Sequence, residues 1–177
     1  MVKKMVVWSG YLLFFIMALI LFVPKSNLYF FMEKSIKPYG VILSNETLHP
    51  ELFSLNISHI DVSVQGIDSA VIHEAKITLL GVYNAVELKG VRLADVAKSW
   101  VPLYVAEATL HYSVVNPLVI EGFTKGDFGE AKAVFSLKEQ HLHVVLKPSK
   151  LMIQKYKNSL RKLKKLKSGE YIYDVAL

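Results

Sequence analysis

Along most of this chain the apolar positions recur with a period of two. In residues 57–64, for example, Ile60, Val62 and Val64 alternate with Asp61 and Ser63. This alternation is typical of strands that have one buried face and one face in water. Runs with the same period cover residues 71–79, 86–89, 106–114, 129–137 and 141–147.

The segments between these runs are short and rich in turn-forming residues. Gln65-Gly66-Ile67-Asp68, Asn116-Pro117 and Lys125-Gly126-Asp127 are three of them. Short separators favour antiparallel hairpins over crossover connections, so residues 40–148 are predicted to form a mainly antiparallel, twisted and curved sheet. One exception is the stretch 93–100, which is predicted to form one or two helical turns before Pro102.

The run at residues 71–79 also predicts which side chains share a face. Val71, Ala75, Ile77 and Leu79 have the same parity as His73. In an uninterrupted strand all five would lie on the same side of the sheet.

The first part of the chain has a different pattern. Residues 5–23 form a run of 19 residues without a charge, behind Lys3 and Lys4. As a helix this run would measure roughly 28 Å, close to the ~30 Å of a bilayer's hydrocarbon core. A cleaved signal peptide is the alternative, but the run is long for one and no small-x-small cleavage pair follows it. Residues 1–24 are therefore predicted to be a cytoplasmic stub and a single transmembrane signal anchor, with the following chain outside the cytoplasm.

Two further segments have helical periodicity. In residues 26–37, Leu28, Phe31, Met32 and Ile36 form an apolar stripe, and Pro38-Tyr39-Gly40 ends the helix. Residues 25–39 are thus predicted to be a membrane-proximal amphipathic segment, whose stripe lies on the membrane surface or packs on the domain; both remain open. Residues 40–177 would be the β-rich domain.

The second helical segment begins after Ser149, which is a suitable N-cap, and runs to about Lys167. Ser168-Gly169 ends it, and the alternation in residues 171–177 predicts a final strand that pairs back into the sheet. The predicted apolar stripe of this helix is Met152, Tyr156, Leu160 and Leu163. The predicted fold class is therefore α+β: an N-terminal transmembrane helix, an antiparallel sheet, a C-terminal basic amphipathic helix and a last strand.

Charge is concentrated in this second helical segment. The formal net charge is +6, and residues 150–167 contain eight basic residues and no acidic one. Such a helix can contact anionic lipid or an acidic partner, or its lysines can simply face water. Nucleic acid is not expected as a partner. The candidate contact residues are Lys155, Lys157, Arg161, Lys162, Lys164 and Lys165.

Catalytic motifs are missing from the sequence. It contains no Gly-x-Ser-x-Gly, no His-Glu-x-x-His, no phosphate-binding glycine loop and no cysteine. His141 and His143 share one strand face, but the spacing supplies no third or fourth metal ligand. We therefore predict a protein that is not an enzyme and that has no cofactor and no metal site.

The order of these segments resembles one known family. Pro38-Tyr39-Gly40-Val41 follows the amphipathic segment, and the closing part contains three further motifs. Together they resemble type II secretion system protein N, in which a glycine-rich strand, a Leu-x-Pro strand end, a basic helix and a Gly-x-Tyr strand close the domain. The closing motifs are Gly126-Asp127-Phe128-Gly129-Glu130-Ala131, Val145-Leu146-Lys147-Pro148-Ser149 and Ser168-Gly169-Glu170-Tyr171-Ile172-Tyr173.

This resemblance implies a role but no catalytic site. It implies a single-pass protein of the bacterial inner membrane, with its β-domain in the periplasm and other envelope secretion components as partners. The same layout is similar to the N-terminal parts of AsmA-like proteins, which implies the alternative function: a lipid-binding or lipid-transport module with an apolar β-groove.

Overall fold

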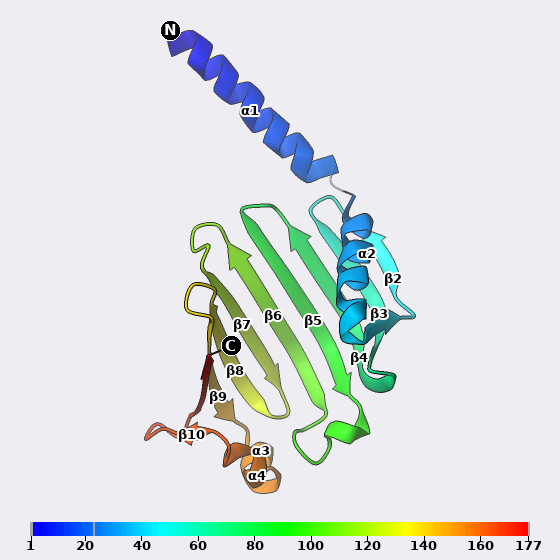
Figure 1. Cartoon of the computed structure of the whole chain (residues 1–177), viewed down its shortest axis with the longest axis vertical. Coiled ribbons are helices and arrows are strands. Elements are labelled where there is room, and N and C mark those ends of the chain that lie inside the picture. Colours follow the sequence, from blue (N-terminus) through cyan, green and yellow to red (C-terminus); the bar gives the residue numbers. More distant parts are fainter. Residues whose placement is uncertain (1, 23, 177) are drawn as a thin grey trace.

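One large antiparallel sheet forms most of the molecule. The computed structural model describes residues 2–22 and 24–176, and Figure 1 shows the sheet with helices near its two ends. The helices are α1 (Val2–Phe22), α2 (Lys25–Ile36), α3 (Lys150–Lys155) and α4 (Lys157–Leu160), with single 3-10 turns η1 (Lys37–Tyr39) and η2 (Asp95–Ala97). The strands are β1 (Val41–Ser44), β2 (Thr47–Pro50), β3 (Ser54–Val64), β4 (Ile67–Leu79), β5 (Tyr83–Leu93), β6 (Tyr104–Ser113), β7 (Val119–Gly126), β8 (Gly129–Ser136), β9 (His141–Pro148), β10 (Lys164–Lys165) and β11 (Tyr171–Ala176).

The strand order follows the chain for most of the sheet. The order is β1-β3-β4-β5-β6-β7-β8-β9-β11-β10, and β2 also pairs with β3. Consecutive strands from β3 to β9 pair antiparallel, so the predicted antiparallel sheet is confirmed. Their connections are short except that between β5 and β6, which contains η2. The last strand also pairs as predicted, because Tyr171–Ala176 lies antiparallel to β9; Leu177 is outside the described residues.

Register places the apolar residues of successive strands in rows on one face of the sheet. One row crosses six strands in the order Leu88, Ala108, Thr124, Ala131, Leu146, Tyr171. The next row is Val86, Leu110, Gly122, Ala133, Val144, Tyr173. The opposite face has charged rows, for example Lys89, Glu107 and Lys125. The period-two pattern therefore produces one continuous apolar face and one polar face.

The alternation is interrupted at one row of residues. His59 in β3 has a positive φ of 58°, and Ile57 and Ile60 on either side of it are both buried. Gly90 in β5 lies in the same row with a φ of 64°, and a Cβ there would be 3.0 Å from the Cβ of His73. The strands thus bend at this row, and the apolar face changes parity across it.

This change of parity corrects the prediction for residues 71–79. Ala75 and Ile77 are buried as expected, but Val71 is 49% exposed and Ile72 packs against the core instead. A sequence pattern assumes an uninterrupted pleat, and the bend at His73 breaks it.

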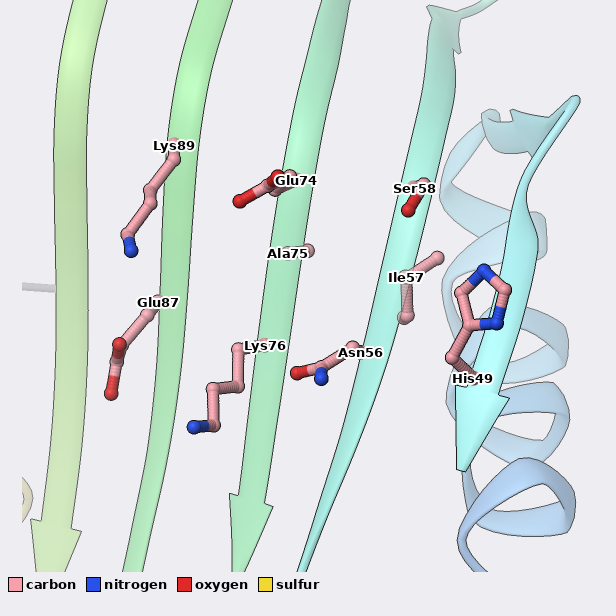
Figure 2. A pocket seen from close by; sticks show the side chains of 9 residues that line it. All are labelled: His49, Asn56, Ile57, Ser58, Glu74, Ala75, Lys76, Glu87 and Lys89. Atoms are coloured by element: carbon pink, nitrogen blue, oxygen red, sulfur yellow. The ribbon is translucent and has the colours of Figure 1, made fainter. Parts of the chain in front are cut away.

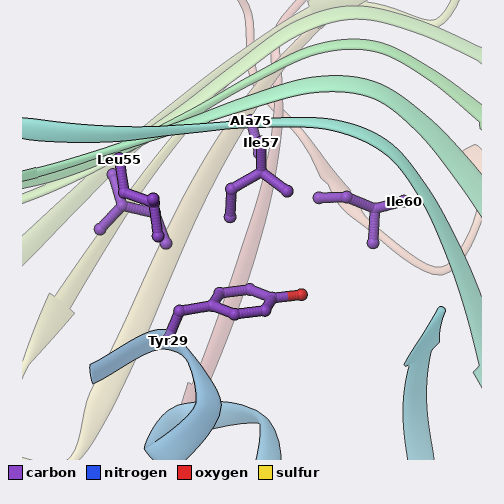
Figure 3. Packing of buried hydrophobic residues seen from close by; sticks show 6 residues of the cluster. Tyr29, Leu55, Ile57, Ile60 and Ala75 are labelled. Atoms are coloured by element: carbon purple, nitrogen blue, oxygen red, sulfur yellow. The ribbon is translucent and has the colours of Figure 1, made fainter. Parts of the chain in front are cut away.

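Helix α2 covers one end of the apolar face. Tyr29 is 4% exposed and packs with Leu55, Ile57 and Ile60, and Figure 3 shows the strands arching over its ring. The helix therefore packs on the domain and belongs to the same folded unit as the sheet, but it does so through Tyr29 and not through the predicted stripe. The packed side of the helix differs from the predicted stripe, because Leu28, Phe31 and Met32 are 38%, 69% and 47% exposed.

Helices α3 and α4 cover the opposite end of the same face. Met152 and Leu160 are buried against Phe128, with Val101, Leu146 and Tyr171 among the partly buried residues around them. The predicted N-cap is confirmed, since the Ser149 hydroxyl accepts a 3.1 Å hydrogen bond from the Met152 amide. The predicted single helix to Lys167 is wrong, because Tyr156 leaves the helical region at φ −116° and ψ 33° and residues 164–165 form β10. After this break in the helix, Leu160 packs against Phe128 and Met152.

The membrane-spanning prediction is also wrong. Within residues 2–22 and 24–176, no helix has both the length and the apolar character required to cross a bilayer. In α1 the segment Trp8-Ser9-Gly10-Tyr11 separates the apolar residues Met5-Val6-Val7 from the apolar run that begins at Leu12. The signal-anchor and single-pass predictions depended on this helix and are corrected with it; Val23 is outside the described residues.

Candidate functional site

The apolar face is uncovered between the two helical ends. Leu110 in β6 is 51% exposed and Tyr173 in β11 is 44% exposed, although both lie in the apolar rows. Figure 1 shows α2 and α3/α4 lying toward opposite ends of the sheet. We call the uncovered region around Leu110, Gly122, Ala133, Val144 and Tyr173 the open apolar face.

A cavity lies where the open apolar face meets the C-terminal helices. Its volume is about 250 Å³, and almost all of its lining is apolar. Val144 and Tyr173 line it from the sheet, and Met152 lines it from α3. We call it the apolar cavity; its other lining residues include Val101, Phe128 and Leu163.

A second cavity of about 410 Å³ adjoins the first. Lys157, Arg161 and Lys165 line it together with apolar residues. Leu163 and Tyr171 line both cavities, so the two adjoin at these side chains. We call this second cavity the basic pocket. Its lining therefore combines basic side chains with apolar ones.

Residues 149–165 form this pocket because the chain changes direction between α3, α4 and β10. Ser149 fixes the start of α3 with its cap, and the Ser149 hydroxyl also donates a 2.5 Å hydrogen bond to the Asp127 carbonyl. The break at Tyr156 then redirects α4, and the pairing of Lys165 with Tyr171 directs the chain back to the sheet. Lysines 157 and 165, eight positions apart, therefore line one cavity.

Only some of the six predicted basic contacts are brought together. Lys157, Arg161 and Lys165 line the basic pocket. Lys162 instead lies over the Trp100 ring, 4.4 Å from its centroid, in a cation–π contact. Lys155 is exposed at the end of α3, and Lys164 is exposed in β10.

A polar cleft lies on the other face of the sheet, near β2. Its volume is about 410 Å³, and Figure 2 shows its charged side chains on neighbouring strands. Glu74 is opposite Lys89 and Lys76 is opposite Glu87, so positive and negative charges alternate across the strands. This balance of charge is typical of a solvated sheet face and selects no particular ligand.

The histidines on the polar face do not form a metal centre. His143 Nδ1 is 2.5 Å from Asp174 Oδ1, and His111 Nε2 is 3.3 Å from Glu121 Oε2. In the part of the chain that the structure describes, no group of three or more His, Asp or Glu side chains could hold a metal ion. These pairs are exposed contacts between neighbouring strands.

One buried hydroxyl lacks a partner. The Tyr29 Oη atom makes no hydrogen bond of ordinary geometry among the described residues, although the Glu46 carboxylate lies near it. Burial raises the pKa of Tyr29 well above its usual range, and the negative charges of Glu46 and Glu33 raise it further. The hydroxyl is thus held neutral at the base of the α2 contact.

Sequence reasoning missed the apolar half of the candidate site. Val101 and Phe128 line the apolar cavity from loops at the ends of strands, where the period-two pattern gives no information. Phe128 lies in the turn segment Gly126-Asp127-Phe128-Gly129, and the residue is only 9% exposed. A large aromatic residue inside a glycine-containing turn was the one available signal.

Comparison with protein-family models, with curated proteins and with solved structures found no match for this chain. The resemblance to type II secretion system protein N therefore stays a prediction, and the functional argument rests on the site itself.

Proposed function

We propose that this protein binds lipid, holding an acyl chain against the uncovered part of its sheet. The observation that carries the proposal is the open apolar face, which continues into the apolar cavity between Val144, Tyr173 and Met152. Apolar surface of this kind costs free energy in water, about 25 cal/mol per Å². An acyl chain would remove that cost by covering the face.

Shape and composition both support a lipid over a polar ligand. The lining of the apolar cavity is almost free of polar atoms, so it offers no directional hydrogen bonds to a sugar or nucleotide. The apolar rows also extend along several strands, as a long flexible chain requires. The polar cleft on the other face has neither property.

The test is direct detection of bound lipid. The full chain would be purified without added detergent and examined by native mass spectrometry, and its organic extract would be analysed for lipids. We expect complexes heavier than the free chain by the mass of one lipid, and we expect added hexadecanol, an uncharged 16-carbon probe, to displace that lipid. A protein that stays empty and does not bind hexadecanol would contradict the proposal.

We also propose a second candidate function, an accessory role in a bacterial envelope secretion apparatus. The observation that favours it is α1, whose apolar side chains are exposed; Trp8 and Phe14 are both 74% exposed. An exposed apolar surface of this size marks an interaction with another apolar surface. In this role α1 would contact a partner protein.

Crosslinking separates this second candidate from lipid binding alone. Tagged protein would be purified from crosslinked cells, and a variant with Trp8 and Phe14 replaced by Ser would be compared with the unchanged chain. Recovery of secretion components with the unchanged chain and their loss with the variant would support the role. Recovery of no envelope component with either would count against it.

A further inference from the structure

The basic pocket contains a group of cations beside an apolar surface. Lys157, Arg161 and Lys165 line it, and Ile153, Leu163 and Tyr171 supply its apolar walls. No acidic side chain lines this cavity. None of the ion pairs found among the described residues involves these three cations.

Three cations in one pocket repel one another unless an anion is present. Two lysines outside the pocket do have acidic partners: Lys125 Nζ is 3.1 Å from Glu130 Oε1, and Lys147 Nζ is 3.5 Å from Glu170 Oε1. The three cations of the basic pocket gather around one cavity that no acidic side chain lines. An anionic group there would reduce the repulsion and would accept charge-assisted hydrogen bonds from Arg161 and the lysines.

The position of the pocket restricts which anion fits. It adjoins the apolar cavity at Leu163 and Tyr171, which line both. A free phosphate would use only the charged part and leave the apolar walls exposed to water. A molecule with an acidic headgroup and an acyl chain would use both parts.

We propose that the basic pocket is the headgroup site for a single anionic amphiphile, whose acyl chain lies in the apolar cavity and on the open apolar face. This inference rests on the proposed lipid-binding function and names its ligand class: one acyl chain with one carboxylate or phosphate headgroup. Lys157, Arg161 and Lys165 bind the headgroup, and Phe128, Met152 and Val144 contact the chain.

The arrangement also determines the direction of the ligand. The headgroup lies at α4 and the chain extends toward Val144 and Leu110, away from the cations. Binding of the acid must therefore depend on salt, because exposed charges are screened beyond about 10 Å at 0.1 M ionic strength. Binding of an uncharged chain must not.

The experiment compares two ligands and two variants, with the full chain in each case. Palmitate and hexadecanol, both below their aggregation limits, would be titrated against the unchanged protein by native mass spectrometry or calorimetry. One variant carries Lys157→Gln, Arg161→Gln and Lys165→Gln. The matched control carries Lys76→Gln, Lys89→Gln and Lys132→Gln on the polar face, with the same change in net charge.

We expect the unchanged protein to bind palmitate about tenfold more tightly than hexadecanol, as one charge-assisted hydrogen bond or more would provide. The pocket variant should lose this preference and bind hexadecanol as before, whereas the control variant should behave like the unchanged chain. Equal affinity for palmitate in all three proteins, with hexadecanol still bound, would overturn the headgroup site alone. Failure of both ligands to bind the unchanged chain would overturn the lipid-binding function itself.

A membrane surface is the competing source of the same headgroups. Vesicles of phosphatidylcholine, with and without phosphatidylglycerol, would be tested with the same three proteins. If the pocket variant lost vesicle binding while its palmitate affinity stayed at the unchanged value, the cations would serve a membrane surface and the single-ligand site would be refuted.

Discussion

The Ser159 hydroxyl donates a 2.6 Å hydrogen bond to the carbonyl oxygen of Trp100, 59 residues earlier in the chain. The Trp100 ring also makes a cation–π contact with Lys162, whose ammonium nitrogen is 4.4 Å from the ring centroid. These two contacts join α4 to the loop before β6. Since Lys157 and Arg161 lie on α4 or directly after it, the same contacts position two cations of the basic pocket.

Replacing Ser159 with Ala should weaken this connection. Loss of one hydrogen bond, here at a partly exposed site, should lower the free energy of unfolding by about 0.5–1.5 kcal/mol. Because α4 would be held less firmly, palmitate affinity should fall as well. Urea denaturation and ligand titration would measure the two effects. Ser35→Ala is the control, because the Ser35 hydroxyl bonds within α2, to the Phe31 carbonyl; an equal loss of palmitate affinity there would refute the positioning role.

Tyr29 should respond in opposite directions to two substitutions. Tyr29→Phe removes a buried hydroxyl that has no partner among the described residues, so stability should stay equal or rise by about 1 kcal/mol. Tyr29→Ala should cost about 3–5 kcal/mol, because the ring fills the contact between α2 and the sheet. Urea denaturation at neutral pH measures both. Equal destabilisation by both variants would mean that the hydroxyl, not the ring, holds α2.

The same residue predicts a dependence on alkaline pH. The folded-state pKa of Tyr29 is raised above the ordinary value of 10.0. The unfolded chain therefore releases this proton at lower pH than the folded protein, and the stabilising contribution, complete below pH ~10, is lost as pH rises above it. Between pH 9 and 11 the unchanged protein should lose stability more steeply than Tyr29→Phe. Parallel pH profiles for the two proteins would contradict the assignment.

Gly90 should not tolerate a side chain. Its φ of 64° disfavours L residues, and a Cβ would be 3.0 Å from the His73 Cβ on the neighbouring strand. Gly90→Ala should therefore cost more than about 1 kcal/mol. Gly66→Ala is the matched control, since its φ of 78° is similar but nothing lies within 4 Å of the added carbon. Thermal denaturation should show the larger loss for Gly90→Ala; equal losses would mean that only φ matters at this row.

A substitution at Leu110 should change ligand affinity but hardly change stability. Because it is 51% exposed, Leu110→Ser should change stability by about 0.5 kcal/mol or less. It lies in the middle of the open apolar face, so hexadecanol affinity should fall several-fold. Val134→Ser is the control, since Val134 is 39% exposed on the opposite face. Titration with hexadecanol tests this, and equal loss in both variants would place the ligand elsewhere.

Much of the sheet could be predicted from local pattern. The alternation of Ala131, Ala133 and Phe135 with charged neighbours assigns these residues to one face of β8, and the structure places them there. The cap at Ser149 was predictable for the same reason, because its hydroxyl acts on an amide only three residues away. Hairpin pairing follows from short turns. All of these features depend on neighbours within a few residues.

The side of α2 that packs could not be predicted, because it depends on the β3–β4 surface that the helix contacts. Leu28, Phe31 and Met32 form the better apolar stripe by sequence, yet Tyr29 is the side chain that reaches the β3–β4 surface. The exit from Pro24 and the entry into β1 together orient the helix. A pattern within one segment contains no information about either constraint. The membrane-spanning prediction failed similarly, by treating the length of an uncharged run as sufficient.

In the candidate site, too, some features follow from local sequence and others from tertiary contacts. The sequence by itself determined that residues 150–167 are basic, that Leu160 and Met152 are apolar, and that most strands alternate apolar and polar side chains. Only the tertiary structure decided that Lys157, Arg161 and Lys165 share a pocket, that Lys162 is on Trp100, and that α4 leaves part of the sheet uncovered. The physical reason is range: side-chain type and strand parity act over a few residues, whereas the break at Tyr156 and the return of the chain to β11 are determined by contacts with Phe128 and Tyr171, distant in sequence.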